Sequence, residues 1–401
     1  MKKLNIYVCL IVEEELNLWH RQFTDTLRQM HHQVFIPPSD IGMRVSWCIK
    51  DMGYWNNKYR EQLTSKILDN VKKQHQKNGI DLFFCYLYPF QFTTDLFKEL
   101  NKLNIPSLYF FCDNFAHPEV AAKYAPCATL NWVPEINAIE QFRQSKSNFI
   151  YLPMAANPNY NYPVEVEETF ELSFFGTKTP YRRDILGHVL GKDLNLKLFG
   201  DGWFTGEKSY HQLEIEEENL LNQLPKFKFK DKVLRYLRYK QSGLSALTRY
   251  GLSYKRKSKE YAKLGIEYED VLQKVACIEP LDYVEANKIY SLSSVTIGIN
   301  DQFNPYLKNS LVIYTKLRDF EATMAGACYL TQKTPDNTNF FEDGKDIMTY
   351  TTADELIDKA KFLQKNEQAR YKLRINAHQR ALSEHTWSHR FEKAFTQLGL
   401  L

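Results

Sequence analysis

Residues 318–332, RDFEATMAGACYLTQ, join a helix-like stretch to a strand-like stretch without an intervening loop. The helix-like part ends in alanine and glycine, which allow a helix to lie close to a sheet, and ACYLTQ is a short, mostly apolar run. A helix leading directly into such a run is typical of parallel sheets. The stretch also opens with Arg318, Asp319 and Glu321, for which the sequence shows no obvious local partner.

The same alternation of apolar runs and amphipathic stretches extends along most of the chain. The proline- and asparagine-rich segment LPMAANPNYNYP, 152–163, breaks it and reads as a linker between domains. The sequence therefore predicts an α/β fold with two Rossmann-like domains, 1–155 and 156–385. The expected strands lie at 4–11, 32–38, 80–88, 105–113, 128–133 and 148–154, and then at 170–177, 194–200, 275–280, 294–300, 327–332 and 346–350.

Length and composition agree with a folded chain of two domains. The 401 residues exceed one comfortable core, and apolar residues are 44% and charged residues 25% of the total. The seven cysteines are scattered without a C-x-x-C pair, which favours reduced thiols and argues against a zinc site. The start, MKKLNIYVCLIVEEE, is expected to be a first strand and not a signal peptide. We expect a cytoplasmic location.

One segment of the second domain lacks strand signals and is expected to be a helical insertion, 207–270. Within it, residues 226–263 carry 13 lysine and arginine residues against two acidic ones, a local net charge of +11, while the whole chain is +4. A membrane-surface helix would use these cations on anionic lipids, with a peripheral position on the inner face of the membrane. A helical hairpin with the acidic LEIEEENLLNQL is an alternative. Nucleic-acid binding is the least favoured of the three readings.

Polar residues follow two of the expected strands in the second domain, where open parallel sheets bind ligands. After FELSFF, Gly176, Thr177 and Arg182 suit an anionic diphosphate, although a plain helix start is the alternative. Asn300 ends the run SVTIGIN and is included among the expected donor-binding residues. Glu321 could accept hydrogen bonds from the vicinal hydroxyls of a sugar, or it could simply favour the helix dipole.

Four motifs occur in order between about residues 278 and 395: IYSLSSVTIGIN, LRDFEATMAGACYLTQ, FFEDGKDIMTYTTADELIDKAKFL and HTWSHRFEKAF. This segment resembles the C-terminal half of group 1 glycosyltransferases, most closely the spore-maturation-type subgroup. The resemblance implies a GT-B architecture of two facing domains, with the nucleotide-sugar held by the second and the acceptor by the first. It also implies that the last helix, 386–401, returns to the first domain. Such enzymes typically need no metal.

By matching position, the resemblance assigns Glu321 to the nucleotide ribose. It directs Arg318 and the loop at Gly176 and Thr177 toward the diphosphate, with Arg182 helping to neutralise it, and Gly326 joins the same donor-binding group. No cofactor is implied, because the UDP- or GDP-linked sugar is itself the substrate.

The chain also departs from the family pattern. Many retaining members carry a glutamate eight residues before Glu321, and here that position is Ile313. The stereochemical outcome therefore stays open, and an inverting reaction would require a general base from the first domain. Asp113 and Glu13 follow expected strands and are the candidates, while Asp113 could equally cap a turn.

These observations lead us to expect a glycosyltransferase acting on a hydroxyl acceptor, such as a glycan or lipid-linked saccharide of the cell surface. A nucleotide-sugar epimerase or hydrolase, and a non-catalytic binding protein, are the alternatives that the sequence leaves open.

Overall fold

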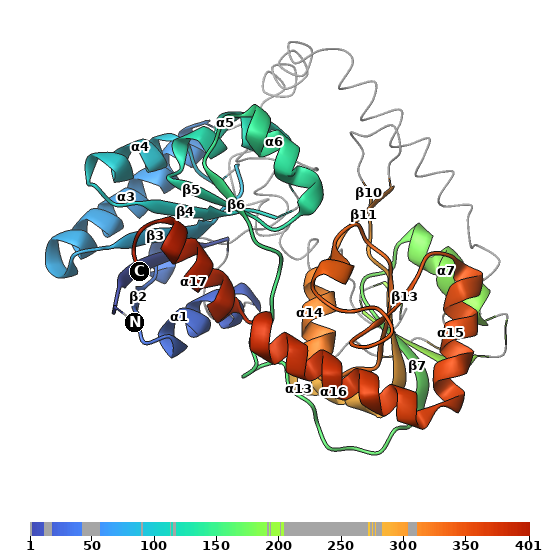
Figure 1. Cartoon of the computed structure of the whole chain (residues 1–401). Coiled ribbons are helices and arrows are strands. Elements are labelled where there is room, and N and C mark those ends of the chain that lie inside the picture. Colours follow the sequence, from blue (N-terminus) through green and yellow to red (C-terminus); the bar gives the residue numbers. More distant parts are fainter. Residues whose placement is uncertain are drawn as a thin grey trace, which may run out of the picture. The chain divides into compact units, whose positions relative to one another are not determined.

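The computed structural model describes residues 2–11, 18–41, 57–89, 91–112, 114, 118–190, 192, 194–200, 202–203, 272, 275, 277, 283–303 and 311–401. They divide into two compact units, which fall within 2–153 with 387–401 and within 154–203 with 272–386 (Figure 1). Asp113, Glu13 and the expected insertion 207–270 lie outside the described residues.

The first unit contains a fully parallel six-stranded sheet in the order β2-β1-β3-β4-β5-β6. Its strands are β1 (Asn5–Leu10), β2 (Gln33–Phe35), β3 (Leu82–Tyr86), β4 (Ser107–Phe110), β5 (Leu130–Val133) and β6 (Phe149–Tyr151). Its helices are α1 (Asp25–Gln29), preceded by a π-helical turn (His20–Thr24), then α3 (Asn57–Asn78), α4 (Asp95–Lys102), α5 (Pro118–Lys123), α6 (Ile139–Gln144) and α17 (Trp387–Gln397). Short 3-10 turns lie at Ser39–Ile41, Ala125–Cys127 and Ile136–Ala138.

Aromatic side chains fill the core on one face of this sheet. Trp387 of α17 is fully buried, and its ring packs edge-on against Phe23 with the centroids 4.8 Å apart. The Trp387 indole N–H donates to the Gln22 side-chain oxygen at 2.5 Å, and its ring also lies 5.9 Å from that of Trp132 on β5. The last helix of the chain is therefore an integral part of the first unit's core.

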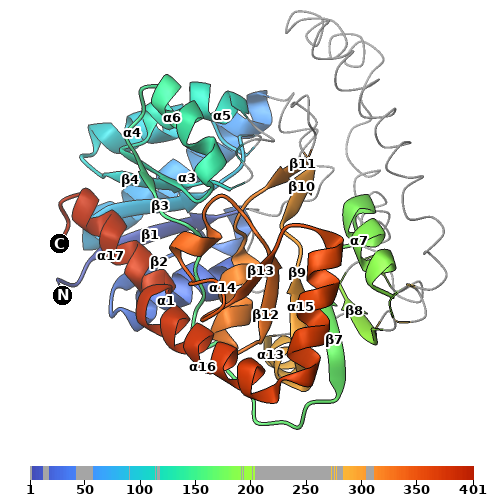
Figure 2. The same cartoon turned by 45° about the vertical axis from the view of Figure 1, so that its right-hand side comes forward.

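The second unit contains a parallel five-stranded sheet in the order β13-β12-β9-β7-β8. Helices α7 and α15 cover one face, and α13 and α14 cover the other, with α16 packed on α14 (Figures 1 and 2). The strands are β7 (Phe170–Phe175), β8 (Leu196–Phe199), β9 (Ser293–Gly298), β12 (Tyr329–Gln332) and β13 (Met348–Tyr350). The helices are α7 (Pro180–Leu190), α13 (Tyr283–Leu292), α14 (Leu317–Met324), α15 (Ala353–Lys365) and α16 (Glu367–Glu384), with a 3-10 turn at Asn337–Asn339.

The α/β class and eleven of the twelve expected strands agree with these sheets. The twelfth run, 275–280, is described only at residues 275 and 277, where Leu198 exchanges hydrogen bonds with both. One pair of strands is not among the expected ones: β10 (Asp301–Phe303) pairs with β11 (Leu311–Ile313) as an antiparallel hairpin.

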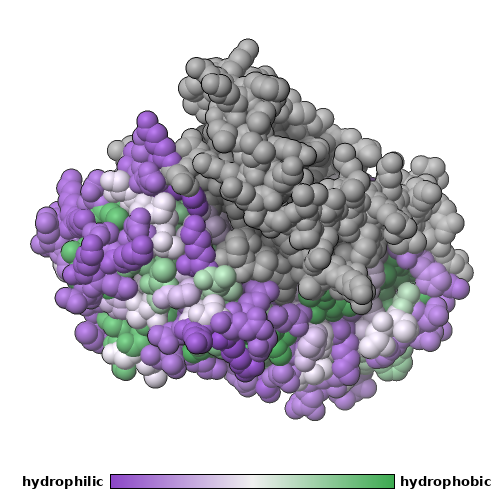
Figure 3. Space-filling view, turned by 90° about the horizontal axis from the view of Figure 1, so that it is seen from above, coloured by the Kyte–Doolittle hydropathy of each residue, from purple (hydrophilic) through white to green (hydrophobic). Residues whose placement is uncertain are grey.

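On the face shown in Figure 3, hydrophobic residues of the described part are scattered in small groups among hydrophilic ones. Among the helices that the structure describes, none is both long and apolar enough to cross a bilayer. Six of the cysteines fall within the described part, and all six are free thiols.

Candidate functional site

Topology places the candidate site at one edge of the second sheet. The chain runs from β7 outward to β8 and then returns to β9 on the other side of β7. The strand order thus reverses between β7 and β9, and ligands of open parallel sheets bind outside the carboxyl ends at such a point. The loop Gly176–Thr179 follows β7, and Asn300 and Asp301 follow β9.

Arg182 ties these two strand ends together. Its Nε atom donates to Asp301 Oδ1 at 2.6 Å, and its Nη1 atom donates to the Thr177 carbonyl at 2.8 Å. The Arg182 side chain is 12% exposed and that of Asp301 is 4% exposed, so this ion pair is largely shielded from water. The guanidinium expected to face a diphosphate is therefore engaged within the chain itself, and its role toward a ligand stays a prediction.

The other side of the loop is held by Trp203, which sequence analysis gave no role. The Trp203 indole N–H donates to the Gly176 carbonyl at 2.7 Å, and its ring packs edge-on against Phe174. Gly200, with φ +123°, lies so close that an added Cβ would stand 2.5 Å from the Gly176 oxygen. The loop of β8 and the loop of β7 therefore pack backbone against backbone, which only glycine permits here.

Arg318 and Glu321 are partners of each other, which answers the question that their position raised. Arg318 Nη1 lies 3.1 Å from Glu321 Oε2 and donates to the Tyr290 hydroxyl at 2.8 Å. The guanidinium also lies 4.1 Å from the ring centroid of Phe175, a cation–π distance. Glu321 is buried, whereas a third of the Arg318 side chain is exposed. The pair thus forms a small group at the carboxyl end of β7.

Burial controls the protonation of this group. It raises the pKa of the Glu321 carboxyl, and the neighbouring Arg318 guanidinium opposes that rise. Burial likewise raises the pKa of Tyr290 to about 12, so that its hydroxyl keeps its proton at neutral pH. Tyr290 can therefore accept from Arg318 and still donate one hydrogen bond.

Asp319, which sequence reasoning left without a role, organises the start of α14. It is buried, and its Oδ2 atom accepts from the Lys316 backbone N–H at 2.7 Å, as an acidic residue at the third helical position can. Its Oδ1 atom accepts from Asn300 Nδ2 and from Thr331 Oγ1, both at 3.0 Å. Burial raises the pKa of this carboxyl, and these hydrogen bonds oppose the rise. Asn300, expected to bind the donor, is thus buried and bonded to Asp319.

Gly326 is not brought together with the other expected residues. It lies past the opposite end of α14, with φ +72°. Its N–H donates to the Thr323 carbonyl, and the Ala327 N–H donates to the Ala322 carbonyl, which is the Schellman pattern of a helix end. Gly326 thus terminates α14 at the amino edge of the sheet, and its expected part in donor binding stays a prediction.

Other expectations remain open. Asp113 and Glu13 lie outside the described residues, so their proposed role as base stays a prediction. Ile313, which stands where the resemblance implies a glutamate in many retaining members, pairs with Asp301 across the β10–β11 hairpin. A carboxylate therefore stands beside that position, although it is bonded to Arg182. Among the residues described, no group of three or more metal-ligating side chains could hold an ion.

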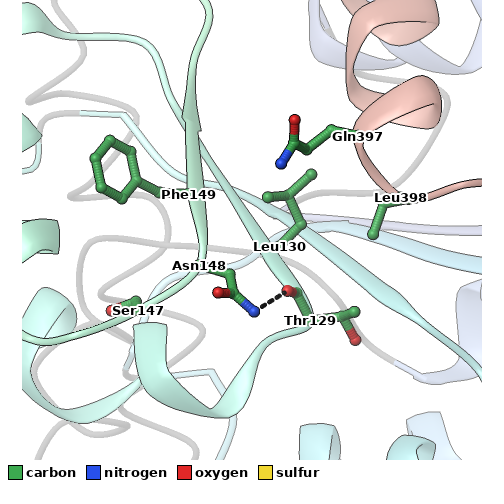
Figure 4. A pocket seen from close by; sticks show the side chains of 7 residues that line it. All are labelled: Thr129, Leu130, Ser147, Asn148, Phe149, Gln397 and Leu398. Atoms are coloured by element: carbon green, nitrogen blue, oxygen red, sulfur yellow. Dashed lines mark hydrogen bonds between the residues drawn. The ribbon is translucent and has the colours of Figure 1, made fainter.

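Two hollows occur elsewhere on the surface. One, of about 490 Å³, belongs to the first unit and lies between the start of β5, the start of β6 and the end of α17 (Figure 4). The other, of about 470 Å³, belongs to the second unit and lies beside α15 and α16. Neither of these two hollows is lined by a residue of the candidate site.

A protein-family model matches part of the chain. Residues 246–396 match a family model described as "Glycosyl transferase-like", a range that includes Tyr290, Arg318 and Glu321. Comparison with curated protein sequences found no match.

Several solved structures share the fold over nearly the whole length. Sucrose-phosphate synthase from Thermosynechococcus elongatus is 13% identical with a TM-score of 0.60, covering 99% of both chains. A glycosyltransferase from Rickettsia africae is 9% identical with a TM-score of 0.58, covering 99% of this chain and 98% of that one. HepE from Anabaena, in complex with UDP and glucose, is 12% identical with a TM-score of 0.55, covering 99% and 100%. The fold is therefore GT-B, with two Rossmann-like domains, as the resemblance implied. The subgroup assignment stays a prediction.

Proposed function

We propose that this protein is a glycosyltransferase that moves a sugar from a nucleotide diphosphate donor to a hydroxyl group of an acceptor. The observation that carries the proposal is the Arg318–Glu321 pair at the start of α14, within the segment that matches the glycosyl transferase-like model. A buried carboxylate beside a partly exposed guanidinium offers an acceptor for ribose hydroxyls and a donor for phosphate oxygens within one helical turn. UDP is the first nucleotide to test, because the structure of HepE is of a complex with UDP and glucose.

In the proposed reaction, the acceptor hydroxyl attacks the anomeric carbon, and the bond from that carbon to the diphosphate breaks. Glu321 orients the ribose, while Arg318 and the loop Gly176–Thr179 stabilise the negative charge of the leaving nucleoside diphosphate. No metal is assigned to this step. For an inverting outcome, Asp113 or Glu13 accepts the proton of the acceptor hydroxyl.

Binding of nucleoside diphosphates tests the donor site. We expect UDP or GDP to raise the unfolding temperature of the full chain, since a ligand present at 100 times its Kd adds about 2.7 kcal/mol to stability. Glu321→Ala should weaken that binding at least tenfold and lower stability by only about 1–2 kcal/mol, because Arg318 keeps its contacts with Tyr290 and Phe175. No stabilisation of the wild type by any nucleoside diphosphate would refute the donor site.

Product analysis then separates the alternatives. Incubation with a nucleotide-sugar and no acceptor yields free or isomerised sugar if the chain is a hydrolase or an epimerase. Binding without turnover in the presence of a panel of glycan and lipid-linked acceptors would identify a non-catalytic binding protein. Transfer to one of these acceptors supports our proposal.

We further propose a lipid-linked or cell-surface glycan as acceptor, a cytoplasmic location and attachment to anionic membranes through residues 226–263. This proposal is supported by the local charge of +11 in the sequence, and the segment lies outside the described residues. Sedimentation with anionic vesicles tests it: deletion of residues 207–270 should abolish co-sedimentation, and unchanged binding would contradict it.

A further inference from the structure

A second ion pair at the same strand ends has no part in the mechanism above. Asp301, the first residue of β10, lies three positions after Gly298, the last residue of β9, and is 5% exposed. Its two carboxylate oxygens are both used: Oδ1 accepts from Arg182 Nε at 2.6 Å, and Oδ2 accepts from Thr179 Oγ1 at 2.9 Å. The carboxylate therefore bonds two residues that lie more than 115 positions earlier in the chain.

Thr179 connects this carboxylate to the start of α7. Its hydroxyl oxygen accepts from the Arg182 backbone N–H at 3.1 Å, which is the hydrogen bond of a helix N-cap. The same hydroxyl gives its only proton to Asp301. The hydrogen bond to Asp301 fixes the position of the Thr179 hydroxyl, and the hydroxyl in turn holds the Arg182 backbone N–H. Asp301 therefore helps to orient the N-terminus of α7.

Arg182 transmits the same restraint to the loop after β7. Besides Asp301, its planar guanidinium donates to the Thr177 carbonyl at 2.8 Å and to the Ile299 carbonyl at 3.3 Å. A planar fork that binds three groups at once fixes their relative positions more tightly than separate hydrogen bonds do. Trp203 holds the preceding carbonyl, that of Gly176, from the other side. Two successive peptide groups of the loop are thereby held in one orientation.

We propose that Asp301 is a positioning residue: acting through Arg182 and Thr179, it holds the loop Gly176–Thr179 in the conformation that receives the donor diphosphate. The ligand named here rests on the function proposed above, whereas the restraint on the loop does not. In this assignment Arg182 acts mainly as the link between Asp301 and the loop, and the backbone of the loop is the surface that meets the diphosphate. Preorganised donors of this kind stabilise charge without the cost of reorganisation.

The test measures loop mobility and ligand binding in the same full-length variants. Asp301→Asn removes the charge with little change in shape, and Thr179→Val removes the hydroxyl with little change in volume. Thr179→Ser restores the hydroxyl and serves as the conservative partner of Thr179→Val. Asp358→Asn, at an exposed position on α15, is the matched acid-to-amide control. Hydrogen exchange of the peptide spanning 176–179 and the Kd for UDP are then compared with wild type.

We expect Asp301→Asn and Thr179→Val to speed hydrogen exchange in the 176–179 peptide at least tenfold and to raise the Kd for UDP at least tenfold. Peptides from β12 and β13 should exchange as in wild type, and Thr179→Ser and Asp358→Asn should match the wild-type exchange pattern. Unchanged loop exchange in Asp301→Asn, or faster exchange throughout the second unit, would overturn the positioning role. If Asp301→Asn does not fold, the Thr179 pair decides the same question.

The two proposals fail differently. If wild-type protein binds no nucleoside diphosphate, the proposed function is refuted, and the exchange of the 176–179 peptide still decides whether Asp301 positions the loop. If wild type binds UDP and the loop loosens in Asp301→Asn without loss of affinity, the loop does not receive the diphosphate and the inference is wrong.

Discussion

At the scale of single residues, two guanidinium groups near the carboxyl edge of the second sheet are paired with carboxylates. Arg318 bonds Glu321, and Arg182 bonds Asp301, with the paired atoms no more than 3.1 Å apart. Buried charges need such partners, because desolvation of an isolated charge costs several kcal/mol. A ligand that binds Arg318 must therefore displace Glu321 from the Arg318 guanidinium or share that guanidinium with it. The protonation state of Glu321 is for this reason relevant to ligand binding.

The Glu321 carboxyl gives a prediction about pH. Its pKa in the folded protein is raised by burial, so between its unfolded value and the raised value the folded state binds more protons than the unfolded state. Its contribution to stability must then fall as pH rises through that window. Glu321→Gln cannot titrate, so its stability relative to wild type should increase steadily as the pH rises from the unfolded pKa of Glu toward neutrality.

Urea unfolding of both proteins over this range measures the difference. Asp319, whose pKa is also raised, is present in both proteins, so its contribution to the pH dependence largely cancels in the difference between them. A difference that does not change with pH would show that attraction to Arg318 cancels the effect of burial, and a change in the opposite direction would show that the attraction outweighs it.

Some of these side-chain contacts could be predicted from the sequence, and others could not. Arg318 and Glu321 are three residues apart, a spacing at which helical side chains meet, so their ion pair could have been anticipated. The Lys316–Asp319 contact has the spacing of a capping box and could also have been found. In contrast, Tyr290 comes from a different helix and Asp301 from a strand 119 residues after Arg182, and only the folded chain brings them together.

At the scale of elements, the apolar strands were predictable because each is an apolar run between helical stretches, and the central ones, such as β3, β4 and β12, are buried along their whole length. The β10–β11 hairpin was not, since the run 301–310, which contains its first strand, is largely polar. The hairpin nevertheless supplies Asp301, so the residue that we propose positions the loop Gly176–Thr179 lies on an element that the sequence pattern does not predict.

The end of α14 offers a prediction at this scale. An alanine at Gly326 would adopt φ +72° and place its Cβ 3.0 Å from Pro163 Cγ. Gly344 has a similar φ of +80°, with nothing within 4 Å of an added Cβ. Gly344→Ala should therefore cost only the backbone strain, about 1–2 kcal/mol, and Gly326→Ala about 1 kcal/mol more for the displaced contact. Urea unfolding measures both, and equal losses would show that Pro163 yields without cost.

At the scale of the whole molecule, the two hydrophobic cores are not formed by two consecutive segments of the chain. The second unit ends at Thr386, and the last helix, α17, belongs to the first unit. Its aromatic residues Trp387 and Phe391 are fully buried against side chains from near the start of the chain. The first core is therefore complete only when the last residues are present, although all six strands of its sheet come from the first 151 residues.

This arrangement predicts that a substitution near the C-terminus destabilises the first unit selectively. Trp387→Ala deletes a fully buried ring and its hydrogen bond to Gln22, at a cost of about 3–5 kcal/mol. Trp387→Phe keeps an aromatic ring and should lose less, while Tyr371→Ala, on α16 and 63% exposed, should change stability by no more than about 0.5 kcal/mol. Hydrogen exchange resolves where the loss occurs: in Trp387→Ala, β3 and β5 should lose protection while β9 and β12 keep theirs. Equal loss of protection in both sheets would mean that the two units unfold as one, and retained protection in β3 and β5 would mean that α17 contributes little to the first core.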